Sequence, residues 1–94
     1  MKISASEQVA SWLSALAPQP KRRVRLALRS LARGRGDIKA LQGSLEGFNR
    51  LRIGGLRIIY QQRSSSEITL EYASTRDVVY EMYEQFLSER KPAG

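Results

Sequence analysis

The 94-residue sequence contains no cysteine and no histidine. Without cysteine, disulfide frameworks and thiolate zinc sites are excluded. Without histidine as well, a conventional metal site and a catalytic triad built on histidine are excluded. We therefore expect no metal and no cofactor, so any chemistry has to come from Arg, Lys, Glu, Asp, Tyr, Ser or Thr side chains.

Long apolar runs are also missing. No run approaches the roughly 20 residues that span a bilayer, and the opening stretch "MKISASEQVA" has no apolar signal core. With 41% apolar and 27% charged residues, the composition is that of a globular protein. The length suits one domain with a modest core. We expect a single domain over residues 1–94, located in the cytoplasm.

Acidic residues are scarce in the middle of the chain, and the net charge is +7. The segment from Lys21 to Arg63 holds twelve Lys and Arg residues against only Asp37 and Glu46, whereas the segment after it is acidic. Such a local positive field predicts a polyanionic partner, either RNA, DNA or an acidic protein. The alternative is a charge that serves only solubility.

Two helices are predicted in the first third of the chain. Ser4 and Glu7 have the spacing of a capping box, and apolar residues then recur at helical spacing, which predicts a helix from about Ala5 to Ala17. A second helix, from about Pro20 to Ala32, begins with a proline in its first turn.

The second predicted helix has a basic side opposite its apolar side. Its arginines recur every three or four residues, at Arg22, Arg25, Arg29 and Arg33. This stripe could follow the phosphates of an RNA backbone. A solvated helix face is an equally good interpretation.

The stretch "FNRLRIGGLRIIYQ", residues 48–61, predicts a tight antiparallel hairpin, with Gly54 and Gly55 at positive φ. Alternation then puts a core set on one face: Leu51, Ile53, Leu56, Ile58 and Tyr60. The other face carries Phe48, Arg50, Arg52, Arg57, Ile59 and Gln61. Arg52 directly opposes Arg57, and like charges facing each other across strands are destabilising. We therefore expect an anion to bind there.

The remaining elements complete an α+β domain: an N-terminal helix hairpin packed on a small antiparallel sheet of three or four strands, followed by a C-terminal helix. Residues 1–3 form a short strand. In the strand "EITLEYAS", Ile68, Leu70 and Tyr72 join the core face and Glu71 lies on the arginine side. The last helix runs from about Asp77 to Ser88, and its apolar side consists of Val79, Met82, Tyr83 and Phe86.

The segments "LQGSLEGFNRLRIGGLRIIYQ" and "YASTRDVVY" together resemble the RelE/ParE superfamily of bacterial type II toxins. RelE-like members cleave mRNA in the ribosomal A site by attack of the 2′-hydroxyl, whereas ParE-like members poison DNA gyrase. The resemblance implies catalytic roles for Arg50, Arg52, Arg57, Arg76 and Tyr80, which favours the ribonuclease branch. It also implies an acidic antitoxin as partner, with mRNA and the ribosome as targets. Phe48, on the arginine side of the hairpin, could stack on an RNA base or only cover the sheet, and the helix stripe is a further candidate contact to RNA.

Two departures from this family concern proton transfer. Arg50 and Arg52 stand where some relatives have lysine, and a guanidinium is a poor general base. Thr75 stands where many relatives have histidine. The remaining candidates for the base are Glu71 and Tyr80.

Two alternative functions stay open, a ParE-like gyrase inhibitor and a non-catalytic RNA-binding homologue. The strand arginines could also only protect an edge, Arg76 could pair with Glu71, and Tyr80 could be a packing residue.

Overall fold

The structure is a computed structural model that describes residues 1–75 and 79–90, without the side chains of residues 86 and 90. Its elements, in chain order, are β1 (Lys2–Ala5), α1 (Glu7–Ala15), α2 (Pro18–Leu31), β2 (Asp37–Ala40), the 3₁₀ helix η1 (Gly43–Leu45), β3 (Asn49–Ile53), β4 (Leu56–Ser64), β5 (Glu67–Ser74) and α3 (Val79–Arg90). No helix in the described ranges is long and apolar enough to cross a membrane.

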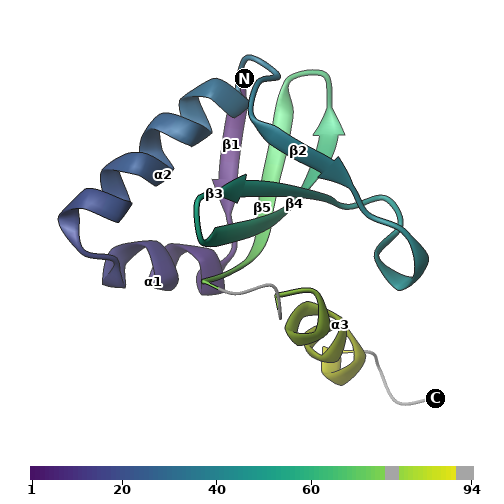
Figure 1. Cartoon of the computed structure of the whole chain (residues 1–94). Coiled ribbons are helices and arrows are strands. Elements are labelled where there is room, and N and C mark those ends of the chain that lie inside the picture. The colour runs from purple at the N-terminus through teal and green to yellow at the C-terminus, as the bar shows by residue number, and fades with distance from the viewer. Residues whose placement is uncertain (76–78, 91–94) are drawn as a thin grey trace.

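The strands form one five-stranded sheet in the order β1-β5-β4-β3-β2. The α+β prediction is confirmed, and the sheet has more strands than the three or four expected. The short β1 pairs parallel with β5, while β2, β3, β4 and β5 pair antiparallel. The N-terminal segment therefore lies beside a strand more than sixty residues further along the chain (Figure 1).

The hairpin has the predicted register. Ile53 pairs with Leu56, and Arg52 faces Arg57. Its turn differs from the expectation because only Gly54 has a positive φ, of 58°. A type II′ turn requires positive φ only at its first central residue, whereas a type I′ turn requires it at both. The turn is therefore of the II′ kind, and Gly55 is not held in the left-handed region.

Both faces of the sheet are covered, and each has its own core. On one side α1 and α2 pack over a cluster that includes Val9, Val24, Leu51, Ile58 and Tyr60. Burial raises the pKa of the Tyr60 phenol, so this group stays neutral at physiological pH. On the other side α3 covers a smaller cluster of buried residues: Leu45, Ile59, Val79 and Tyr83. Figure 1 shows the α1–α2 pair and α3 in separate places around the sheet.

Tyr72 was expected on the same face as Ile68 and Leu70, and this prediction is wrong. Ile59 pairs with Tyr72 but Tyr60 pairs with Leu70, so Glu71 is an extra residue on β5. Such a bulge moves every following side chain to the opposite face, because the side-chain period of a strand is two. Tyr72 consequently packs in the α3 cluster, 5.5 Å from Tyr83 between ring centroids.

The predicted C-terminal helix exists, and only part of its expected apolar side is covered. Val79 and Tyr83 are buried, whereas Met82 is 41% exposed. The side chain of Phe86 lies outside the described residues, as do residues 77 and 78, where the helix was expected to begin.

The cap of α1 is Ser6 rather than the predicted Ser4. Residues 2–5 are held in β1, so the helix starts later and runs from Glu7 to Ala15. Ser6 Oγ accepts a hydrogen bond from the Val9 amide at 3.2 Å and donates one to the Glu71 carbonyl at 2.8 Å. One side chain thus caps the helix and ties it to the bulge on β5.

Replacing Ser6 with alanine should lower the free energy of unfolding by about 1–2 kcal/mol, because a cap and a bond to the sheet are lost together. Ser4→Ala is the matched control. Ser4 has no side-chain hydrogen bond among the described residues, so its loss should stay within about 0.5 kcal/mol. Urea unfolding of both variants measures the difference, and equal losses would contradict the assignment of the cap.

Candidate functional site

Two rows of side chains cross the sheet on the side that α3 covers. One row runs through Asp37, Arg52, Arg57 and Ser74, which are successive partners across β2, β3, β4 and β5. The adjacent row is Lys39, Arg50, Ile59 and Tyr72. Because directly paired residues point to the same face, five charged residues share one surface. We call this surface the arginine face: Asp37, Lys39, Arg50, Arg52 and Arg57.

Arg57 lies at the centre of the sheet and is only 8% exposed. Its Nη1 donates to the Gly54 carbonyl at 2.8 Å and to the Leu56 carbonyl at 3.2 Å, so the guanidinium braces the hairpin turn. The guanidinium is thereby held in a fixed position on the same face of the sheet as Arg50 and Arg52.

Two more guanidinium groups meet the same turn. Arg52 Nε approaches the Gly54 carbonyl at 3.4 Å, and Arg23 Nη1, from α2, lies 3.6 Å from where a Cβ on Gly54 would stand. Like charges gathered around one carbonyl repel each other. The turn is therefore a local concentration of positive charge that an anion would relieve.

Arg50 has both a partner and an unmet donor. Its Nη2 contacts Asp37 Oδ1 at 3.0 Å, and its side chain is 11% exposed against 57% for Asp37. Its Nε is buried and has no hydrogen-bond partner among the described residues. A buried donor without an acceptor costs free energy. Arg50 therefore has hydrogen-bonding capacity that its contacts within the described residues do not use.

Glu71 lies on the α3 side, as predicted, but its partners are not the hairpin arginines. Arg63 Nη2 contacts its carboxylate at 3.5 Å, and the Tyr83 hydroxyl donates to the same carboxylate at 3.4 Å. The carboxylate that touches the arginine face directly is that of Asp37.

The other predicted site residues lie at different distances from the arginine face, and one of them is outside the described residues. Tyr80 is half-buried in the α3 cluster and lines a hollow beside β2. Phe48 packs edge-on against Tyr83, with ring centroids 5.4 Å apart at 81°, so its ring is partly covered by α3. Arg76 lies outside the described residues.

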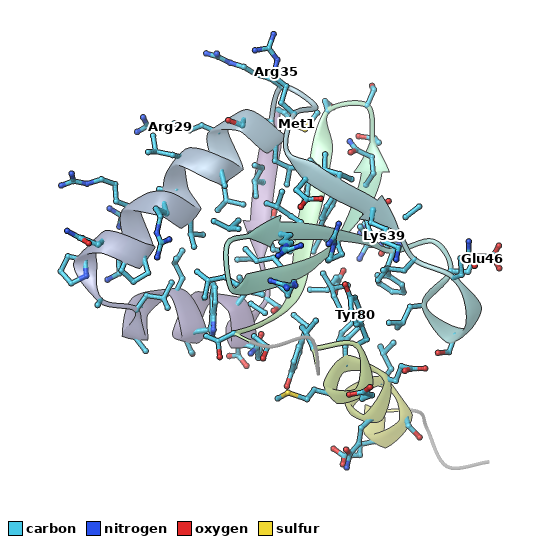
Figure 2. All side chains as sticks on the ribbon, viewed as in Figure 1. Met1, Arg29, Arg35, Lys39, Glu46 and Tyr80 are labelled. Carbon is cyan, nitrogen blue, oxygen red and sulfur yellow. The ribbon has the colours of Figure 1, made fainter. Side chains whose placement is uncertain are left out.

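The basic stripe of α2 does not join the arginine face. Arg22, Arg25 and Arg29 are exposed and line a shallow hollow on the outer side of α2, and Arg33 is exposed beyond the helix end. Since α2 packs on the opposite face of the sheet from α3, the sheet separates the two basic surfaces. Figure 2 shows Arg29 pointing outward from α2, and Tyr80 at the start of α3 in a different part of the molecule.

Three charged residues at the site were missed in the sequence: Arg23, Asp37 and Lys39. Asp37 and Lys39 could have been found only by predicting that residues 37–40 pair with β3. The sequence of residues 37–40 alone does not indicate this pairing. Arg23 lies outside the regular stripe of α2, so only the packing of the helix beside the hairpin brings it to the turn.

No protein-family model matches the sequence, and no curated protein sequence matches it significantly. Solved structures are similar in fold. RelE in the RelB–RelE antitoxin–toxin complex from Methanococcus jannaschii matches with a TM-score of 0.66 and 16% identity, over 85% of this chain and 98% of that one. YafQ from E. coli matches with a TM-score of 0.66 and 15% identity, over 84% and 97% of the two chains.

A third match is the YoeB–YefM complex from Staphylococcus aureus, with a TM-score of 0.64 and 19% identity over 79% of this chain and 94% of that one. This chain has the RelE/ParE toxin fold. The matches cover 79–85% of this chain and 94–98% of the solved chains, so the likeness extends over most of the fold. At 15–19% identity the likeness concerns the fold, and the roles of individual residues have to be argued from their own contacts.

The opposition of Arg52 and Arg57 predicts an unusual stability effect. Arg52→Thr removes the repulsion and introduces a residue that favours strands, so the free energy of unfolding should be unchanged or rise by up to about 1 kcal/mol. Arg50→Thr is the matched control on the same strand. It should cost about 1–2 kcal/mol, because a mostly buried side chain and the contact with Asp37 are lost. A clear loss with Arg52→Thr would show that this residue stabilises the sheet.

The contact of Asp37 with Arg50 predicts that Asp37 weakens anion binding. Asp37→Asn should tighten binding of a short RNA by roughly three- to tenfold at low salt, with a smaller gain at high salt. Glu46→Gln, which removes the other acidic residue of the basic segment, should change affinity little, because Glu46 is not on the arginine face. Fluorescence anisotropy with a 2′-O-methylated RNA measures both variants. An unchanged affinity for Asp37→Asn would place the RNA elsewhere.

Proposed function

We propose that this chain is the toxin of a type II toxin–antitoxin system and cleaves mRNA on the ribosome. The observation that carries the proposal is the arginine face, where Arg50, Arg52 and Arg57 gather on one side of the sheet and the buried Arg50 Nε has no acceptor within the described part of the chain. Arg52 and Arg57 repel each other across the strands, and a phosphate between them would relieve this repulsion. The RelE/ParE fold supports the same reading.

The reaction that fits this surface is transfer of a phosphate within the RNA chain. The 2′-oxygen forms a bond to the adjacent phosphorus while the bond to the 5′-oxygen breaks, which leaves a 2′,3′-cyclic phosphate and a free 5′-hydroxyl. One proton leaves the 2′-hydroxyl and one is delivered to the 5′-oxygen. The charge that develops on the phosphorane oxygens is stabilised by the guanidinium groups of the arginine face.

Arg57 is the residue best prepared to stabilise that charge. Its guanidinium is held by the hairpin turn before any RNA arrives, so little reorganisation is needed as the charge develops. Arg50 and Arg52 flank it and would hold the phosphate and the 2′-hydroxyl in line. Arg76 and Tyr80 keep the catalytic roles that the family resemblance implies.

Proton transfer would fall to a side chain other than arginine, because a guanidinium stays protonated at any physiological pH. The candidates on the α3 side of the sheet include the carboxylates of Asp37 and Glu71 and the hydroxyl of Tyr80. Asp37 is the exposed one of the two carboxylates and touches Arg50, whereas Glu71 is already engaged by Arg63 and Tyr83.

The antitoxin would be an acidic segment that covers the arginine face in the cytoplasm. RelB–RelE and YoeB–YefM were solved as toxin–antitoxin complexes. Acidic segments that fold on binding are steered by a surface of opposite charge. By covering the arginine face, such a segment would exclude RNA from it.

The decisive experiment separates Arg57 from the α2 stripe. Arg57→Ala should lower single-turnover cleavage of a ribosome-bound message by roughly 100-fold or more and leave binding within a few-fold, because its contact strengthens as charge develops. The double variant Arg25→Ala with Arg29→Ala should weaken binding and its salt dependence, by about one unit of log–log slope for each lost phosphate contact. It should leave cleavage at saturation unchanged.

Controls address stability and mechanism. Because Arg57 is buried and braces the turn, unfolding of each variant is measured first and cleavage is assayed well below the transition. Arg57→Lys should rescue only part of the rate, since a point charge cannot grip two phosphate oxygens. Full activity of Arg57→Ala would refute the nuclease mechanism. Intact mRNA together with arrested replication would point to the gyrase-inhibiting branch instead.

A further inference from the structure

The positive charge of the arginine face continues around the hairpin turn to the α2 side of the sheet. On the α3 side, Arg52 Nε approaches the Gly54 carbonyl at 3.4 Å. Arg23 comes from α2, which packs on the opposite face, and its Nη1 lies 3.6 Å from where a Cβ on Gly54 would stand. One residue of the turn therefore meets guanidinium groups from two surfaces that the sheet otherwise separates.

Apolar packing brings Arg23 to this place. Its neighbour Val24 is fully buried in the cluster under α1 and α2. Ile53 and Leu56, which flank the turn, pack against the same cluster. Because α2 is thereby held beside the end of the hairpin, the side chain that precedes Val24 reaches the turn.

Neither Arg23 nor Arg52 has a carboxylate partner within the described part of the chain, and both are exposed. Arg50, by contrast, contacts Asp37. Guanidinium groups that gather without an anion repel each other. The planar fork of arginine matches the oxygens of a phosphate. A phosphate at the turn is therefore the anion that Arg23 and Arg52 fit.

The turn itself leaves room for such a phosphate. Apart from its chain neighbours, no described atom lies within 4 Å of the place where a Cβ on Gly55 would stand, and at Gly54 the same place is bordered by the Arg23 guanidinium. Both glycines are exposed. Glycine lets a ligand approach the backbone closely. An RNA strand can therefore pass over the turn within reach of Arg23.

We propose that the turn of Gly54 and Gly55 is a second phosphate site. Arg23 and Arg52 hold the phosphate next to the cleaved one, so the RNA strand crosses the end of the hairpin from the α3 side toward α2. The inference deepens the proposed ribonuclease function and rests on it for the identity of the first phosphate, whereas binding at the turn is measured without cleavage. Arg23 is then a residue that binds the substrate and does not touch the reacting phosphate.

The test uses 2′-O-methylated oligouridylates, from the dinucleotide to the hexanucleotide, which cannot be cleaved by attack of their own 2′-oxygen. Each competes with a labelled hexanucleotide for the purified full chain, and fluorescence anisotropy measures the affinity. When the strand becomes long enough to reach the turn, the affinity should rise by about three- to tenfold. The log–log dependence on salt should steepen by about 0.7 unit, the value for one more phosphate contact on a single strand.

Arg23→Gln should bind the shortest RNAs like the wild type and lose the gain on the longer ones. The matched control is Arg35→Gln, which has the same charge change at an exposed residue beyond the C-terminal end of α2. Figure 2 shows Arg35 pointing away from the molecule, so this variant should keep the gain. Gly55→Ala is the second test variant. It puts a methyl group into open space at a position without a positive φ, so the fold should be retained while binding of the longer RNAs falls severalfold.

The outcomes separate the turn from the overall charge. If Arg23→Gln weakens binding equally at every length, or if Arg35→Gln has the same effect, Arg23 acts only through the general positive field and the site is overturned. An unchanged gain in Arg23→Gln overturns it as well. Binding of a glutamate decapeptide that depends on Arg23, with RNA binding unaffected, would assign the turn to a protein partner instead.

The outcomes also separate the turn from the proposed function. Cleavage that depends on Arg57, without a gain in affinity at the turn, would keep the ribonuclease and refute the second phosphate site. A gain that depends on Arg23, without cleavage of unmethylated or ribosome-bound RNA, would keep the site and refute the ribonuclease.

Discussion

Ile58 and Ile59 are neighbours on the central strand β4, both are fully buried, and they point to opposite faces of the sheet. Ile58 anchors the core under α1 and α2, and Ile59 anchors the smaller core under α3. The rest of the architecture depends on this double burial, because it determines on which face of the sheet each neighbouring side chain lies and therefore which helix that side chain meets. Arg57 lies two residues before Ile59, so its side chain points to the same face of the sheet, the α3 side.

The arginine face follows from this orientation of Arg57. On this side the small α3 core occupies only part of the sheet, and the rows through Arg50 and Arg57 continue from it to the hairpin turn. Apolar packing and a dense positive charge therefore lie next to each other on one surface. A low-dielectric neighbourhood strengthens the interaction of the guanidinium groups with an anion as well as their mutual repulsion. The same packing that stabilises the domain would thus strengthen the binding of the phosphate that we propose for this surface.

The sequence was informative where local rules decide the structure. The Gly-Gly turn and the alternation around it determine the hairpin register, so the facing pair Arg52 and Arg57 could be predicted correctly. Helical spacing and prolines located α1 and α2 to within a few residues. These signals depend on residues close together in the sequence, so tertiary packing changes the resulting hairpin and helices little.

Long-range pairing could not be predicted in the same way. The parallel pairing of β1 with β5 and the bulge at Glu71 depend on residues far apart in sequence, and they moved Tyr72 to the other face and the helix cap from Ser4 to Ser6. The same limit applied to the site. Arg23, Asp37 and Lys39 reach the arginine face or its turn only through tertiary packing, whereas Arg50, Arg52 and Arg57 belong to the hairpin itself.

The parallel pairing of β1 with β5 also has a consequence for synthesis of the chain. β1 is made well before its partner among the described strands, residues 67–70, and α1 is tied to the same strand through Ser6 and Gln8. Contacts between distant segments are formed late, because a long loop has to close first. The first core therefore cannot be completed until β5 has left the ribosome. Until then the nascent chain lacks the complete sheet, so the arginine face reaches its final packing only after β5 has been made.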